Sequence, residues 1–127
     1  MYVINPFNWS LMEATIDSFN QLVQWLLFFE KEGALHKIHF GLILENKTNE
    51  SLCVGMVQEE WVLIHSKDTD NQHFTISEEV KEGSVEIYFE RLDELPKKML
   101  ILKKQALDAI QYWIGNGGMD NRIIWSN

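Results

Sequence analysis

The clearest structural signal in this chain lies in residues 38–66, IHFGLILENKTNESLCVGMVQEEWVLIHS. Apolar residues occupy every second position over 38–44 and again over 52–56, and the polar run 46–51 separates the two stretches. Such alternation is typical of strands that bury one face, and the polar run predicts a turn between them. A second polar turn then leads into a strand over 61–66. We therefore predict an antiparallel meander in this part of the chain.

Further strands are expected beyond this stretch. A short strand over 73–77 follows a polar loop, and Val85, Ile87 and Phe89 then alternate with Glu86, Tyr88 and Glu90. A last strand is predicted near the end of the chain, where two isoleucines precede Trp125. The meander is thus expected to continue after its first three strands.

A C-terminal helix is predicted over 102–114, because apolar residues recur there at helical spacing. The run 115–118, Gly-Asn-Gly-Gly, follows directly. Glycine adopts positive φ without a steric penalty, so this run is expected to end the helix.

An N-terminal helix is predicted over about 11–31. Ser10 and Glu13 have the spacing of a capping box, and Gly33 offers a left-handed stop. The run 25–29, WLLFF, widens the apolar stripe in the last turns, so we expect another segment to cover this end, and the same run leaves oligomerisation open. The stripe itself consists of Met12, Ile16, Phe19, Val23 and Leu26.

These elements predict an α+β fold: an antiparallel meander sheet of about five to six strands packed with an N-terminal and a C-terminal helix. With 127 residues, 46% hydrophobic and 24% charged, residues 1–127 are expected to form a single domain. The run 25–29 is the longest apolar one and is too short to cross a bilayer, so no membrane contact is expected. Cys53 is the only cysteine, which excludes an intramolecular disulfide and fits a cytoplasmic location.

The charge of the chain limits its partners. Eleven lysines and arginines stand against nineteen aspartates and glutamates, a net charge of -8. A protein with this net negative charge is repelled by a phosphate backbone, so direct binding of nucleic acid is not expected. A basic protein surface would instead be steered toward it.

Carboxylates near the predicted turns are the candidate partner-binding residues. Trp61 directly follows Glu59 and Glu60 at a hairpin end, where an aromatic side chain ringed by carboxylates could anchor a partner. The other candidates lie in two later turns, where they could contact lysines and arginines of a partner: Asp68, Asp70, Glu78, Glu79 and Glu82.

The residue patterns give little support to the hypothesis that this chain is an enzyme. His65 and His73 flank the loop that contains Asp68 and Asp70, so a small hydrolase or metal-binding enzyme is one alternative. A solvated acidic loop explains the same residues more simply. Cys53 lies within an apolar strand pattern with no neighbouring base, so it is expected to fill the core. We predict no catalytic residues, no metal and no cofactor.

Five short segments together carry a family resemblance, and they are Leu52-Cys53-Val54-Gly55, Glu60-Trp61-Val62-Leu63-Ile64-His65, Val85-Glu86-Ile87-Tyr88-Phe89, Gln105-Ala106-Leu107-Asp108-Ala109-Ile110 and Ile123-Ile124-Trp125. With the predicted layout they resemble the type-one immunity proteins of bacterial polymorphic toxin and contact-dependent growth inhibition (CDI) systems. The similarity covers residues from about 38 to 125.

The resemblance implies a small cytoplasmic α+β protein that binds the toxic C-terminal domain of its cognate secreted or contact-delivered effector and blocks it. The effector would be a nuclease or a nucleic-acid deaminase, and the inhibitor would have no catalysis of its own. An acidic adaptor or regulatory protein-binding module is the alternative from another class. Whether the chain acts as a monomer or a homodimer stays open.

Overall fold

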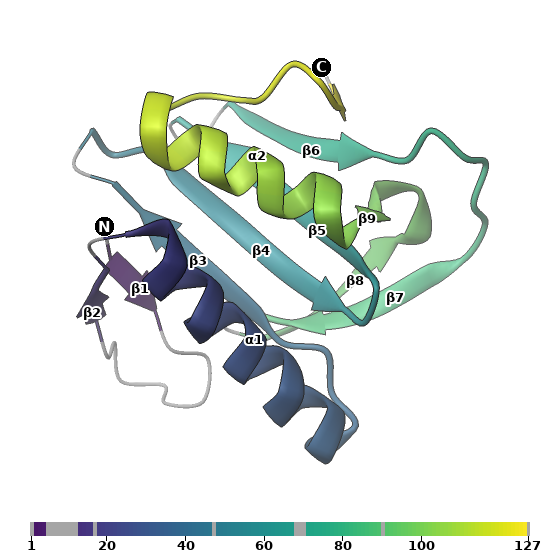
Figure 1. Ribbon diagram of the computed structural model, residues 1–127. Coiled ribbons are helices and arrows are strands. Elements are labelled where there is room, and N and C mark those ends of the chain that lie inside the picture. Colours follow the sequence, from purple (N-terminus) through teal and green to yellow (C-terminus); the bar gives the residue numbers. More distant parts are fainter. Residues whose placement is uncertain are drawn as a thin grey trace.

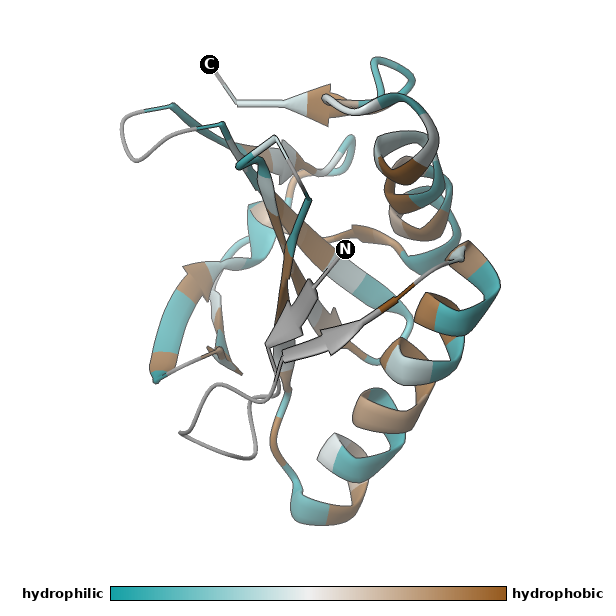
Figure 2. Ribbon diagram, turned by 90° about the vertical axis from the view of Figure 1, so that its left-hand side faces the viewer, coloured by the Kyte–Doolittle hydropathy of each residue, from teal (hydrophilic) through white to brown (hydrophobic). Residues whose placement is uncertain are grey.

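The computed structural model describes residues 2–4, 13–16, 18–46, 48–67, 71–89 and 91–126. These residues form three layers (Figures 1 and 2). An antiparallel sheet is the middle layer, two helices cover one of its faces, and a β-hairpin covers the other. The predicted α+β class is confirmed.

The predicted meander forms the centre of the sheet. Its strands are β3 (Gly41–Glu45), β4 (Ser51–Val57), β5 (Glu60–Ser66) and β6 (Gln72–Ile76), each antiparallel to the next. Leu44 pairs with Leu52 and Leu42 with Val54, so these four buried side chains lie on the same face, toward the helices.

Short strands extend this central meander. β1 (Tyr2–Ile4) pairs with β3, and β2 (Glu13–Thr15) pairs with β1 at that edge. β10 (Ile124–Trp125) pairs with β6 and confirms the predicted last strand, whereas β9 (Ile101–Leu102) pairs with the start of β5. The alternation pattern did not predict β1, β2 or β9, because strands of two or three residues are too short to show a period.

The first helix, α1 (Phe19–His36), begins later than the predicted residue 11. Glu13 lies in β2, where its backbone pairs with Ile4, and not at the start of a helix; Ser10, the other residue of the predicted capping box, lies outside the described residues. Ser18 is the N-cap instead, because its hydroxyl accepts the backbone N–H of Gln21 at 3.2 Å. The buried stripe of α1 consists of Leu22, Leu26, Phe29 and Gly33.

The end of α1 also differs from the prediction. Gly33 is buried within the helix, and a Cβ there would lie 2.4 Å from the carbonyl oxygen of Ile38. Glycine is therefore needed at 33 because the backbone at Ile38 passes close to the helix there. It does not end the helix as the sequence had predicted. Lys37 takes the left-handed conformation, with φ of 57°, and its N–H bonds to the carbonyl of Ala34.

The substitution Lys37→Gly is expected to raise the free energy of unfolding by about 1 kcal/mol, because the left-handed conformation is costly for a residue with a Cβ. Lys31→Gly, at an exposed interior position of the same helix, is the control and should lower it by a similar amount. Urea denaturation of both variants measures the difference. A lower stability for Lys37→Gly would contradict this account of the helix end.

The cover expected over the run 25–29 is incomplete. Phe29 is buried and Trp25 stacks on it with ring centroids 5.8 Å apart. Leu27 and Phe28 are 42% and 54% exposed, so no described segment covers them. The outer side of α1 thus keeps accessible apolar surface.

The strand predicted over 85–89 does not join the meander. It forms β7 (Ser84–Tyr88), which pairs with β8 (Leu92–Pro96) in a separate two-stranded sheet on the face opposite the helices (Figure 2). A period of two shows that one face of a strand is buried, but it does not identify the neighbouring strand. Ile87 and Phe89 pack there in a second core with Val62.

The connection from β8 leads through a 3₁₀ turn, η1 (Lys97–Met99), to the second helix, α2 (Lys103–Asn116). The predicted bounds of α2 were nearly right, and Gly117 ends the helix with φ of 73° as the glycine-rich run indicated. Its buried side packs on the same sheet face as α1. Neither helix in the described part of the chain has the length and apolarity needed to span a bilayer.

Candidate functional site

Five of the predicted partner-binding residues come together at one end of the sheet. Two depressions in the surface there share Glu60 and Lys81 in their walls. Glu78 and Glu79 line the first depression, whereas Glu59 and Glu82 line the second. We call these five residues the acidic end: Glu59, Glu60, Glu78, Glu79 and Glu82.

Lys81 lies in the middle of the acidic end. Its ammonium group forms an ion pair with Glu60 and donates to the carbonyl oxygen of Leu100 at 3.3 Å. Burial lowers the pKa of Lys81. The charge of Glu60 is thus matched within the molecule, while the four other glutamates are exposed.

The segment 77–83, which carries three of these glutamates, is attached to the body of the protein at both ends. The N–H of Ser77 donates to the carbonyl of Lys98 at 2.7 Å, and the N–H of Lys97 donates to the carbonyl of Gly83 at 2.9 Å. Lys81 holds the middle of the segment. Binding of a partner would therefore cost little conformational entropy in this segment.

Trp61 does not belong to this surface, although it was predicted as a partner anchor. The side chain is completely buried, and its Nε1–H donates to Glu30 Oε2 at 2.7 Å and to the carbonyl of Gln58 at 3.1 Å. Lys103 donates to the other oxygen of Glu30 and lies 5.4 Å from the indole centroid. Trp61 joins both helices to β5, so its predicted role at an interface is wrong.

Asp68 and Asp70 lie outside the described residues. The described residues that flank them, Lys67 and Asn71, follow the end of β5 opposite to Glu60. A strand of seven residues is about 20 Å long. Their flanks are therefore separated from the acidic end by the length of β5.

His65 and His73, the histidines of the alternative enzyme hypothesis, are cross-strand partners on β5 and β6. They contact different groups, since His73 Nδ1–H donates to the carbonyl of Ser126 at 2.7 Å and His65 contacts Glu50. Among the described residues, no group of three histidine, cysteine, aspartate or glutamate side chains could hold a metal ion.

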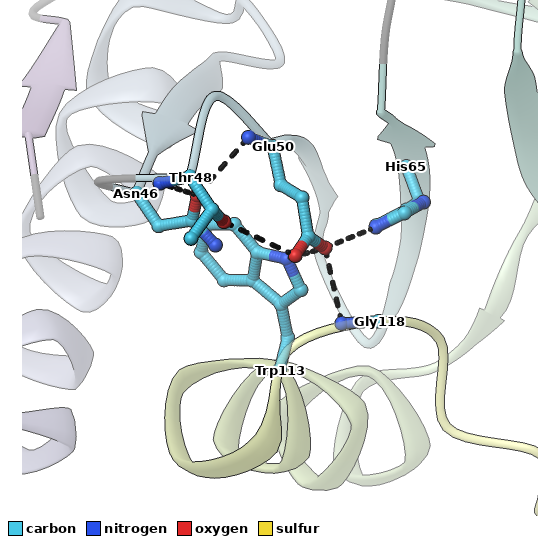
Figure 3. Close-up of polar contacts among 6 residues, drawn as sticks. All are labelled: Asn46, Thr48, Glu50, His65, Trp113 and Gly118. Carbon is cyan, nitrogen blue, oxygen red and sulfur yellow. Dashed lines mark hydrogen bonds and ion pairs between the residues drawn. The ribbon is translucent and has the colours of Figure 1, made fainter.

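Glu50 is the centre of a polar network that links distant parts of the chain (Figure 3). Its Oε2 atom accepts from His65 Nε2–H at 2.8 Å, from Trp113 Nε1–H at 3.2 Å and from the N–H of Gly118 at 3.0 Å. The turn before it is held by Asn46, whose Oδ1 accepts the N–H of Glu50 at 3.0 Å. One carboxylate thus connects the β3–β4 turn, β5 and the end of α2.

These donors hold Glu50 in its ionised form. The hydrogen bond from His65 is the largest influence and, together with those from Gly118 and Trp113, outweighs burial and lowers the pKa of Glu50 to about 2. A carboxylate only accepts, so His65 carries a proton on Nε2. Its Nδ1 is buried and has no partner in the described structure.

The Glu50–His65 pair resembles the carboxylate and imidazole of a catalytic dyad, because the acid orients the ring and leaves one nitrogen free. His65 is only 5% exposed, however, and a substrate could not reach Nδ1 without opening the fold. The network therefore links segments of the fold that lie far apart in the chain. Sequence reasoning missed it because Glu50, His65 and Trp113 are far apart in the chain.

The last segment of the chain is held by a second carboxylate. Asp120 is almost completely buried and accepts from Arg122 Nε–H and Arg122 Nη2–H at 2.9 Å and 2.6 Å. The hydrogen bonds from Arg122 hold the pKa of Asp120 below its usual value despite burial. The carbonyl of Asp120 accepts Trp125 Nε1–H at 2.8 Å, which positions β10 beside β6.

Comparison with known proteins gave no match, either to a protein-family model or to a curated protein sequence.

Proposed function

We propose that this chain is an immunity protein. It binds the toxic C-terminal domain of a cognate secreted or contact-delivered effector, a nuclease or nucleic-acid deaminase, and neutralises it stoichiometrically in the cytoplasm. The observation that carries the proposal is the acidic end, where residues from the β4–β5 turn and from the segment 77–83 form one surface. The resemblance to type-one immunity proteins points the same way.

The chemistry of the acidic end suits such a partner. An enzyme that acts on nucleic acid needs a basic groove for the phosphates, and carboxylates can occupy that groove in their place. Five glutamates and two lysines line the two depressions, and three of the four exposed glutamates lie on the attached segment 77–83. Binding is expected to be fast and sensitive to salt.

The triple substitution Glu59→Lys, Glu79→Lys and Glu82→Lys is expected to weaken binding of the toxin domain by at least 100-fold. Each change replaces attraction with repulsion at an exposed position, so the association rate should fall most. The melting temperature should stay within a few degrees, because none of the three side chains is buried. Surface plasmon resonance at two salt concentrations measures the effect.

Glu45→Lys, Asp93→Lys and Asp108→Lys together form the matched control, with the same change in net charge away from the acidic end. The control should lose affinity only slightly, through the long-range field. Equal losses in the two triple variants would show that net charge, and not this surface, recognises the partner.

The immunity function is tested by the identity of the gene directly upstream and by the survival of cells that produce the toxin domain. The toxin domain used as the probe is the C-terminal domain of the large effector encoded directly upstream, produced in cells with and without this chain. We expect protection by the wild type and loss of protection by the acidic-end triple variant. An unrelated upstream gene, or equal killing with and without the chain, would contradict the proposal and favour an adaptor function.

A further inference from the structure

A groove of about 670 Å³ lies between the second half of α1 and the β4–β5 turn. Leu27 and Ile38 line it and are 42% and 40% exposed, Ala34 adds exposed apolar surface, and the buried Met56 closes its wall. This volume is within the range of about 300–1,000 Å³ that is typical of ligand pockets. The groove is therefore large enough for an aromatic or long aliphatic side chain with part of its backbone.

The charges around the groove have opposite signs on its two sides. Lys31 and Lys37 lie on the helix side, and Glu59 lies on the side of the β4–β5 turn. Glu30 also lines the groove, but its carboxylate is already bound by Lys103 and Trp61 at 2.7 Å each. In the described structure, Lys31, Lys37 and Glu59 form no ion pair, so these three charges are available to a partner.

The groove is continuous with the acidic end. Gln58 and Glu59 line both the groove and the depression that contains Glu60 and Glu82. A single partner can therefore cover the β4–β5 turn from both sides. An apolar centre with charged groups around it is the usual composition of a strong protein interface.

We infer that this groove is the apolar anchor site of the same interface. It takes an aromatic or long aliphatic side chain of the toxin domain, from a segment with a basic residue on the Glu59 side and an acidic residue on the side of Lys31 and Lys37. The inference rests on the proposed function for the identity of the partner. The apolar contact supplies the slow dissociation that exposed charges alone do not provide.

Filling the groove tests this assignment. Ala34 is exposed and lines the groove, so Ala34→Trp should block it without disturbing the core. Gln24→Trp introduces the same residue at an exposed position of the same helix outside the groove. We expect Ala34→Trp to weaken toxin binding at least 50-fold, mainly through faster dissociation, and Gln24→Trp to change it less than twofold.

A peptide probe separates this inference from the proposed function. Acetyl-Lys-Trp-Glu-amide, titrated into labelled wild-type protein, should shift the amide signals of Leu27, Ala34 and Gln58, whereas acetyl-Lys-Ala-Glu-amide should not. Shifts elsewhere, or none, would overturn the groove assignment even if the toxin domain binds. Normal toxin binding by Ala34→Trp would also overturn it and leave the proposed function intact. If no toxin domain binds but the peptide shifts these signals, the proposed function fails and the groove assignment holds.

Discussion

Replacing Glu50 with glutamine is expected to lower the free energy of unfolding at pH 7 by about 3 kcal/mol. The pKa of Glu50 falls from an ordinary value of 4.5 to about 2 in the folded protein, and each unit corresponds to about 1.4 kcal/mol. Glutamine removes the charge and places an amide where His65, Trp113 and Gly118 all donate. Urea denaturation at constant salt measures the loss.

The control for this variant is Glu45→Gln, which removes the same charge from an exposed residue at the end of β3. It should change the free energy of unfolding by less than about 0.5 kcal/mol. Similar losses in both variants would show that the effect comes from net charge and not from the network.

The same carboxylate predicts how stability depends on pH. Because folding lowers the pKa of Glu50, its contribution is fully present above pH 4.5 and is lost as the pH falls from 4.5 toward 2. The stability gap between the wild type and Glu50→Gln should therefore narrow over this window. A gap that stays constant from pH 7 to pH 3 would contradict an ionised acceptor at this position.

Replacing Gly41 with alanine is expected to cost about 2–3 kcal/mol, because the new methyl group would overlap the ring of Phe89. A Cβ at Gly41 would lie 2.2 Å from the nearest ring atom, and this ring is buried between the sheet and the β7–β8 hairpin. Gly55 pairs directly with Gly41 and contacts Ile87 in the same way. The two glycines thus form the flat area on which β7 packs.

Gly115→Ala provides a control with the opposite sign. A Cβ at Gly115 has no neighbour within 4 Å, and the residue is exposed in the last turn of α2. Alanine there should stabilise the protein by about 0.5–1 kcal/mol.

Hydrogen exchange provides a second measurement on Gly41→Ala, and it should show earlier opening of β7 and β8 than in the wild type. Unchanged protection of the hairpin would mean that the glycine pair does not set the contact between the layers.

Local patterns were sufficient for the parts of the fold that depend on neighbours in the sequence. The alternation over 38–66 predicted β3, β4 and β5 with both turns, and the helical spacing with the glycine-rich end predicted α2. The predicted start of α1 was wrong, because Glu13 pairs with Ile4 in the sheet and the helix begins only at Phe19. A local pattern cannot report a partner that lies elsewhere in the chain.

At the candidate site, too, the sequence predicted some features and only the folded structure revealed others. The clusters around Glu59 and Glu79 were evident as exposed carboxylates at turns, and the fold brought them to one surface. Trp61 follows two glutamates, which suggested exposure, but its indole lies under α1 and α2, where Glu30 and Lys103 hold it. Its neighbours in sequence were therefore misleading about its neighbours in space.

The amino-acid order alone determined the strand meander, the C-terminal helix, the acidic character of the surface and the turns that carry it. These features follow from periodicity, turn chemistry and charge, which act between residues close in sequence. Only the tertiary structure decided that β7 forms a second layer, that Trp61 is core and Glu50 a half-buried acceptor, and that an apolar groove adjoins the acidic end. Each of these depends on contacts between distant segments, because packing and desolvation act on whatever the fold brings together.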